Sequence, residues 1–147
     1  MSPIEEKNFA RELLKLWPLG VVKSVNEALG GAVNQVFRVD SGLGVFYLRV
    51  YKTAEKNRVL REHKLLEFLA SKNLPAVQTL PSIYGQSIVE KDGKFGALYF
   101  SAQGTQVSKK QLTLGQAQGA GEMLARLHFA LKDLPDVGYR TYGLNWD

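Results

Sequence analysis

Cysteine is missing from this 147-residue sequence. A chain without thiols forms neither disulfides nor thiolate metal sites, so a reducing compartment is the simplest expectation. Long apolar runs are missing as well: none reaches the ~20 residues of a membrane-spanning helix. The first residues, MSPIEEKNFARELLK, are charged where a secretory signal would be apolar. We therefore expect a cytoplasmic protein with no membrane partner.

Blocks of like charge are also missing, although Lys and Arg outnumber Asp and Glu by 19 to 14. The basic residues are scattered, and none of them form a cluster that alternates with aromatic side chains, as a nucleic-acid stacking surface requires. We interpret the net charge of +5 as solvated surface charge and expect no nucleic-acid partner. The charge also fits affinity for anionic ligands such as nucleotides. The alternative, a basic nucleic-acid binder, would show strongly salt-dependent binding.

The composition, with 45% hydrophobic and 22% charged residues, is that of an ordinary globular protein. Apolar residues at helical spacing predict helices over residues 4–17 and 55–71. Alternation predicts a strand at about 21–29, a hairpin across the turn SGLG, and a second hairpin in SIVEKDGKFGALYF around Asp92-Gly93. Capping-box spacing predicts a helical region from residue 108 to about 131. The predicted fold class is α+β, a five-stranded antiparallel sheet with a packed helix, an N-terminal helix before it and a long helix after it.

The stretch from residue 28 to 52 joins a glycine turn to a strand with a positive charge in its middle. Gly30 and Gly31 allow the backbone to approach a ligand closely, and Asn34 adds an amide donor. Tyr47 and Arg49 fall on one face of the strand, with Leu48 on the other. An aromatic ring beside a cation under a glycine turn would suit a stacked base and its phosphates. A plain glycine hairpin with Arg49 in solvent is the alternative.

The second predicted helix carries an acid on its apolar stripe. Val59, Glu62, Leu66 and Leu69 follow one another at helical spacing. A carboxylate in such a place needs a partner, because an unpaired buried charge costs about 3–5 kcal/mol. Arg49 on the preceding strand is one candidate. The other is Arg58, four residues earlier on the helix, in an exposed pair worth only about 0.3–0.5 kcal/mol.

These features, taken in order, resemble a known family. A glycine turn, the strand YLRVY, the helix REHKLLEFLA, a hairpin, the segment ALYFSAQG and a helix ending MLARLH resemble the aminoglycoside phosphotransferase and choline kinase family. Its members are small-molecule kinases with a protein-kinase-like fold. The resemblance covers about residues 20–131 and implies that the predicted sheet and helix form a kinase-like N-terminal lobe.

The resemblance also implies a role for each candidate residue. The turn from Gly30 to Asn34 would cover the phosphates of ATP, and Tyr47 would lie against the adenine. Arg49 would contact the α- and β-phosphates while pairing with Glu62, although the family usually has lysine there. Backbone groups of the hinge would meet the adenine edge, with Leu98 as an apolar wall. The implied hinge residues are Ser101, Ala102 and Gln103.

Phosphoryl transfer needs an aspartate near the acceptor hydroxyl and side chains that hold Mg²⁺. The family supplies these in a His-Gly-Asp segment and beyond, but neither His63 nor His128 is followed by Gly-Asp. We therefore expect residues 1–100 to be a nucleotide-binding lobe, 101–107 a hinge, and 108–147 the helical start of a truncated C-terminal lobe. The chain alone should be inactive. Its full-length parent would use ATP and Mg²⁺ to phosphorylate a hydroxyl of a small metabolite or aminoglycoside-like substrate.

A second hypothesis is a stand-alone kinase-like module that binds nucleotide or a protein partner without catalysis. The two hypotheses differ in the surface they expose. A lobe without its partner lobe would present apolar surface and tend to self-associate, whereas a self-contained module would be monomeric.

Overall fold

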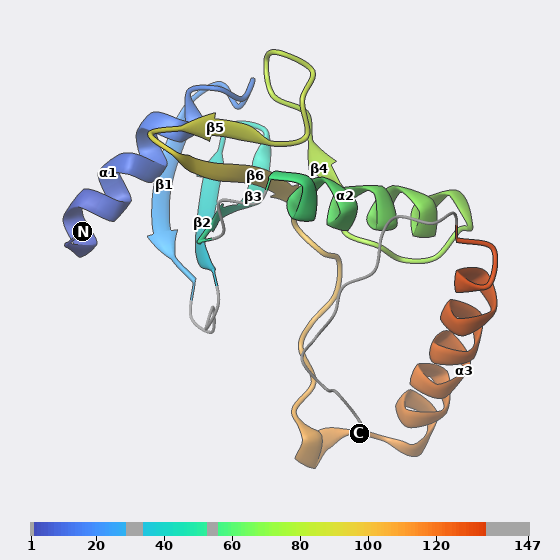
Figure 1. The fold of residues 1–147 in the computed structure, drawn as a ribbon. Helices are drawn as coiled ribbons and strands as arrows, with labels where there is room; N and C mark the ends of the chain where they lie inside the picture. Colours follow the sequence, from blue (N-terminus) through green and yellow to red (C-terminus); the bar gives the residue numbers. More distant parts are fainter. Residues whose placement is uncertain (1, 29–33, 53–55, 135–147) are drawn as a thin grey trace, which may run out of the picture. The chain divides into compact units, whose positions relative to one another are not determined.

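The computed structural model describes residues 2–28, 34–52 and 56–134 of the chain. It divides into two compact units. The first comprises residues Met1–His63 and Val77–Gln103, and the second comprises Lys64–Ala76 and Gly104–Asp147. Figure 1 shows the elements of each unit along the chain.

The first unit is built on an antiparallel sheet, as predicted (Figure 1). The described residues form six strands, in the order β1-β2-β3-β6-β4, with β5 paired to β6. The extra strand relative to the prediction is β4, which has only two residues and no sequence pattern of its own. The strands are β1 (Val22–Glu27), β2 (Gln35–Ser41), β3 (Gly44–Tyr51), β4 (Thr79–Leu80), β5 (Val89–Lys91) and β6 (Lys94–Phe100).

The β5–β6 hairpin turns at Asp92 and Gly93, as the sequence predicts. Both residues have positive φ angles, 50° and 72°. This pair of left-handed residues matches the right-handed twist of the flanking strands, and glycine adopts the conformation without strain.

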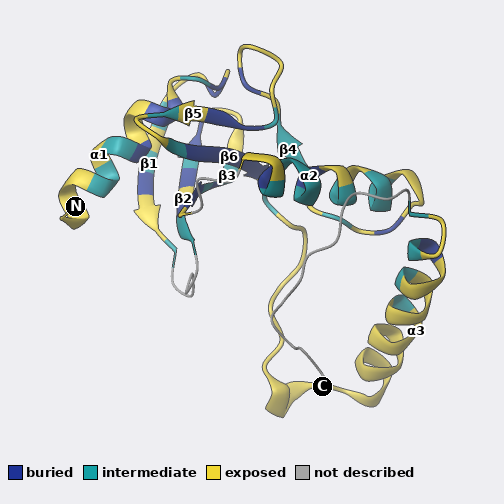
Figure 2. Cartoon of the chain, viewed as in Figure 1, coloured by how far each residue is buried: buried dark blue, intermediate teal, exposed yellow. Residues whose placement is uncertain are grey.

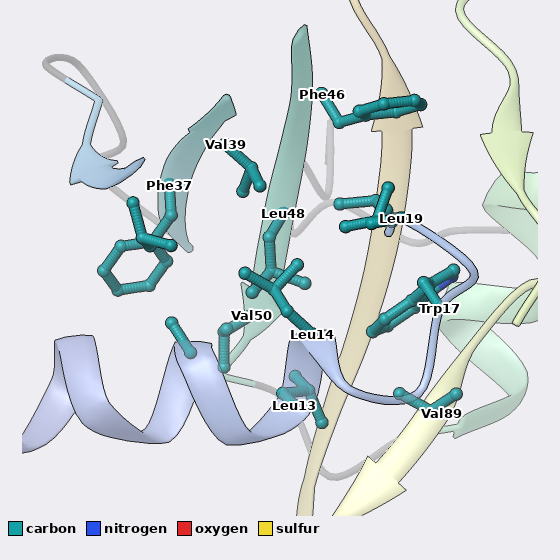
Figure 3. Close-up of a cluster of buried hydrophobic side chains, with 13 residues drawn as sticks. Leu13, Leu14, Trp17, Leu19, Phe37, Val39, Phe46, Leu48, Val50 and Val89 are labelled. Atoms are coloured by element: carbon teal, nitrogen blue, oxygen red, sulfur yellow. The ribbon is translucent and has the colours of Figure 1, made fainter. Parts of the chain in front are cut away.

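Helix α1 (Pro3–Leu14) covers one face of this sheet. A capping box between Ser2 and Glu5 starts it. Leu13 is fully buried in a core that includes Leu48 of β3 (Figure 3). Leu98 of β6 belongs to the same core. Colouring by burial shows this core as the dark band along the central strands (Figure 2). The predicted helix extended to residue 17, but α1 ends at Leu14. Pro18 has no backbone N–H, and in a continued helix its ring would clash with the Leu14 carbonyl four residues earlier.

Helix α2 (Lys56–Ser71) begins in the first unit and continues into the second. The second unit also contains a short 3-10 turn, η1 (Lys109–Gln111), and helix α3 (Leu114–Leu131). The capping box of Thr113 and Gln116 starts α3, as its spacing predicts. Among the described residues, no helix combines the length and apolar character needed to cross a bilayer.

Candidate functional site

Strand pairing places Arg49 on the sheet face opposite the α1 core. Residues directly opposite each other on antiparallel strands share a face, and Arg49 of β3 pairs with Ala97 of β6, while Tyr47 pairs with Tyr99. Leu48 pairs with Leu98, and both lie in the core beneath α1. Leu98 is therefore not available as a wall for a ligand on the Arg49 face, which corrects that expectation. The register between β3 and β6, which the sequence does not reveal, decides this.

The guanidinium of Arg49 and the carboxylate of Glu62 meet across β3 and α2. Arg49 Nη1 lies 3.9 Å from Glu62 Oε2. The two side chains are 40% and 34% exposed, so solvent screens the pair and limits its contribution to stability to about 0–1 kcal/mol. Glu62 is not the buried charge that the apolar stripe predicts. The pair is better understood as positioning a cation at a partly open surface than as holding the fold together.

Two tyrosine rings flank the Arg49 guanidinium. Its central carbon lies 5.2 Å from the ring centroid of Tyr99 and 5.8 Å from that of Tyr51. Both distances fall within the range of cation–π attraction, worth about 0.5–1 kcal/mol each at partly exposed sites. Arg49 is therefore oriented by a carboxylate and by two aromatic rings.

A buried hydrogen-bonded cluster lies behind this cation. The Tyr51 and Tyr99 hydroxyls are 2.5 Å apart, and His63 Nε2 lies 3.0 Å from the Tyr99 hydroxyl and 3.3 Å from that of Tyr51. On its other side, His63 Nδ1 lies 2.9 Å from the Ser87 hydroxyl. A neutral imidazole has one donor and one acceptor nitrogen, which suits partners on both sides. These hydrogen bonds connect α2 to β3 and β6 at the residue next to Glu62.

The environment keeps this cluster uncharged. Burial disfavours the imidazolium form, and the nearby Arg49 charge repels it, which together lower the pKa of His63 to about 4. Burial also raises the pKa of Tyr51 and of Tyr99. Near neutral pH the four side chains therefore add no charge around Arg49.

His63 is a site residue to which the sequence motifs assign no role. It follows Glu62 directly and stands four residues after the buried Val59, so it lies on the inner face of α2. A polar residue on that stripe is the signal that could have identified it. Its partners come from β3, β6 and the segment before β5, and only the folded chain brings these together.

The remaining predicted residues lie around this centre or outside the described part. Gly30 and Gly31 belong to residues 29–33, which lie outside the described residues. Asn34, directly before β2, accepts a hydrogen bond from the Lys52 backbone N–H at 3.3 Å through its side-chain oxygen. Its amide nitrogen is the group that could donate to a phosphate. Tyr47 is half-buried on the Arg49 face.

The predicted hinge follows the end of β6. Ser101 is half-buried, and Ala102 and Gln103 are exposed. The Ser101 hydroxyl donates to the Ala102 carbonyl at 3.4 Å. Gly104 follows with a φ of +110°, a conformation that side chains rarely adopt. Strand β6 is thus followed by a mostly exposed segment, residues 101–103, and then by the left-handed backbone conformation of Gly104.

The described residues contain no group of three or more His, Asp or Glu side chains that could hold a metal ion. Mg²⁺ is bound mainly by carboxylates, waters and substrate phosphates. The described part of the chain therefore does not fit a protein-built metal site.

Two sequence comparisons with known proteins both point to phosphotransferases. Residues 24–147 match the family model described as the phosphotransferase enzyme family. A homoserine kinase of Polaromonas naphthalenivorans (strain CJ2) is 27% identical over 148 residues, covering 99% of this chain and 46% of that protein. The chain thus spans about half the length of the curated relative it matches.

Solved structures share the fold at low sequence identity. An amicoumacin kinase in complex with AMP-PNP, Ca²⁺ and Ami has a TM-score of 0.77 at 15% identity, with 92% of this chain and 44% of that chain covered. A microcompartment-associated aminopropanol kinase gives 0.71 at 16% identity, with 92% and 44% covered. A spectinomycin phosphotransferase in complex with ADP and spectinomycin gives 0.69 at 14% identity, with 87% and 38% covered. The α+β architecture is therefore that of small-molecule kinases.

Proposed function

The chain belongs to the phosphotransferase enzyme family, and from that premise we propose that its first unit binds ATP in an enzyme that phosphorylates a hydroxyl of a small molecule. The observation that carries the proposal is the Arg49–Glu62 pair, 3.9 Å apart and backed by the neutral His63 cluster. Such an arrangement presents one oriented cation at a partly exposed surface. A guanidinium there can bind phosphate oxygens with two parallel N–H groups.

In this proposal the site residues divide into those that bind the phosphates of ATP and those that contact its adenine. Arg49 binds the α- and β-phosphates, and Glu62 limits the directions in which its guanidinium can point. Tyr47, two residues earlier on the same face, lies against the adenine. The backbone of residues 101–103 meets the adenine edge, and Gly30, Gly31 and Asn34 lie over the phosphates. Two of the solved relatives are complexes with ADP or AMP-PNP, which supports a nucleotide as the ligand.

Transfer of the γ-phosphoryl group requires groups beyond these. A loose transition state is stabilised by positioning and by cations, and the acceptor hydroxyl needs a base nearby. We propose that residues 1–100 form the nucleotide lobe, 101–107 the hinge and 108–147 the beginning of a second lobe. In a full-length parent that second lobe would supply the catalytic aspartate and the Mg²⁺ ligands. The acceptor would be a small metabolite or an aminoglycoside-like compound.

Titration of the 147-residue chain with ATP tests the nucleotide site. Calorimetry on the wild type and on the Arg49→Ala, Tyr47→Ala and Lys7→Ala variants separates the possibilities. We expect Arg49→Ala and Tyr47→Ala each to weaken binding about tenfold, from the loss of a charge-assisted contact or a stacked ring worth about 1.5 kcal/mol. Lys7→Ala removes a charge from α1, on the other sheet face, and should leave the affinity unchanged. Equal affinities in all four proteins would show that the nucleotide site is elsewhere or absent.

A second candidate is a non-catalytic kinase-like module that binds nucleotide or a protein partner. Such a module would bind ATP equally well with and without Mg²⁺. A parent of the relatives' length would instead consume ATP when an acceptor is added, so the two proposals predict different outcomes for one coupled assay.

A further inference from the structure

The hydrogen positions in the cluster behind Arg49 follow from a count of its donors and acceptors. Tyr51, Tyr99 and His63 are 3%, 6% and 2% exposed, so their polar hydrogens need acceptors inside the protein. Ser87 is only half-buried, so its own hydroxyl proton can be donated to solvent. The cluster therefore has three buried groups that must share hydrogens with one another and one end that is open.

One tautomer of neutral His63 gives every buried hydrogen of the cluster an acceptor. With the proton on Nδ1, the Tyr51 hydroxyl donates to the Tyr99 oxygen at 2.5 Å, and the Tyr99 hydroxyl donates to Nε2 at 3.0 Å. The Nδ1–H of His63 then donates to the Ser87 oxygen at 2.9 Å. The four groups form a chain in which each donates to the next, and the bonds of such a chain polarise one another.

The other tautomer leaves a tyrosine proton without an acceptor in the cluster. With the proton on Nε2, His63 becomes a donor to the tyrosine pair and can no longer accept from it. One tyrosine hydroxyl can still donate to the other, but the second then has no acceptor left within the cluster. Because a buried donor without a partner is costly, the geometry favours the proton on Nδ1.

The direction of this chain matters for Arg49, because the same two tyrosine rings flank its guanidinium. The central carbon of Arg49 lies 5.2 Å from the ring centroid of Tyr99 and 5.8 Å from that of Tyr51. A phenol that donates its proton carries more negative charge on its oxygen and its ring, which strengthens the attraction of the ring for a cation. The same hydrogen bonds hold the hydroxyl ends of both rings in place.

We propose that His63 is a positioning residue for Arg49: as the acceptor at the end of the tyrosine chain, it polarises and holds the two rings that orient the guanidinium. Ser87 supports this role by accepting the Nδ1 hydrogen. The inference rests on the nucleotide site proposed above, in which Arg49 binds phosphates. The competing account gives the cluster a structural role alone, joining α2 to the sheet. It predicts that loss of the cluster lowers stability without changing how Arg49 binds phosphate.

Two NMR measurements test this role without a nucleotide. The sequence contains two histidines, so in a His128→Gln background the imidazole nitrogen signals come from His63 alone. Long-range proton–nitrogen correlation near neutral pH should show a proton on Nδ1 and none on Nε2. The Nε–H signal of Arg49, assigned by its loss in Arg49→Lys, should show the upfield ring-current shift of a guanidinium held over aromatic rings. Tyr99→Phe keeps the ring but removes the link to His63, and it should reduce that shift.

ATP titration then measures the consequence for binding. His63→Leu and Tyr99→Phe should each weaken ATP binding about threefold and leave adenosine binding unchanged. His63→Gln, whose amide oxygen can still accept from Tyr99, should recover most of the affinity. In an Arg49→Ala background the same substitutions should have no effect, because the cation that they position is gone. Gly96→Ala is the matched control: its methyl group would press on Leu13 in the α1 core, so it should lower stability and leave ATP affinity unchanged.

Failure of the positioning role can be told apart from failure of the nucleotide site. A proton on Nε2 of His63, or an Arg49 signal that neither His63→Leu nor Tyr99→Phe alters, would overturn the positioning role. So would a loss of ATP affinity that persists without Arg49 or that Gly96→Ala reproduces. A wild-type chain that binds no ATP would contradict the nucleotide site, and the two NMR signals would still decide whether His63 positions the guanidinium. If His63→Leu does not fold, Tyr99→Phe provides the same comparisons.

Discussion

Replacing His63 with glutamine should change how the stability of the first unit depends on pH. The folded-state pKa of His63 is lowered to about 4 from an ordinary value of 6.5. Between pH 4 and pH 6.5, His63 is therefore protonated in the unfolded chain but neutral in the folded chain. The stability linked to His63 is fully present above pH 6.5 and is lost as the pH falls toward 4.

The size of the effect follows from that shift. Each pH unit in the window should remove about 1.4 kcal/mol from the free energy of unfolding, and the whole shift about 3 kcal/mol. Glutamine does not titrate, so the variant lacks this contribution. Near pH 7.5 it should be less stable than the wild type by about 1–3 kcal/mol, because its amide cannot satisfy both the tyrosine hydroxyls and Ser87. The difference should shrink as the pH falls.

Urea unfolding followed by Trp17 fluorescence in the Trp146→Phe background measures this difference. Curves at pH 7.5, 6.5, 5.5 and 4.5 for the wild type, His63→Gln and a His128→Gln control are sufficient. His128 lies on α3 in the second unit and is exposed, so its variant removes an imidazole without disturbing the His63 cluster. Parallel curves for the wild type and His63→Gln over the whole range would mean that His63 is not held neutral by burial, and the cluster behind Arg49 would lose its explanation.

Two further predictions concern the scaffold. Gly96→Ala should cost about 1–3 kcal/mol, measured by urea unfolding, because the added Cβ would lie 2.4 Å from Cδ2 of the fully buried Leu13; unchanged stability would mean that α1 is packed less closely on β6. Thr113→Ala should reduce the stability of α3 by about 1 kcal/mol, because Thr113 accepts from the Gln116 N–H at its first turn. Circular dichroism during thermal unfolding measures it, and an unaltered helical signal would show that packing alone maintains the helix.

Local patterns predicted most of the secondary structure and one contact of the site. Alternation in β3 and helical spacing in α2 made Arg49 one of two candidate partners for Glu62, because each pattern fixes the face of one element. The family resemblance then selected Arg49, and the structure places the two side chains 3.9 Å apart. The turn at Asp92 and Gly93 was predictable for a similar reason, since the residue pair itself determines the backbone conformation.

Features that depend on distant pairings were not predictable in this way. The face occupied by Leu98 depends on the register of β3 against β6, and β4 is too short to have a pattern. The role of His63 depends on hydroxyl groups 12 and 36 residues away along the chain. The sequence also suggested a buried Glu62, whereas its side chain is 34% exposed, because an apolar stripe does not reveal how deeply a helix face packs.

The most direct measurement for the proposed nucleotide site combines one substitution with one change of ligand. Calorimetric titration of the wild type and Arg49→Ala with ATP and with adenosine gives four binding free energies. If Arg49 binds the phosphates, the substitution should weaken ATP binding about tenfold or more and leave adenosine binding nearly unchanged, a coupling of at least about 1.4 kcal/mol. The same loss for both ligands, or no loss for either, would show that the guanidinium of Arg49 does not bind the phosphates.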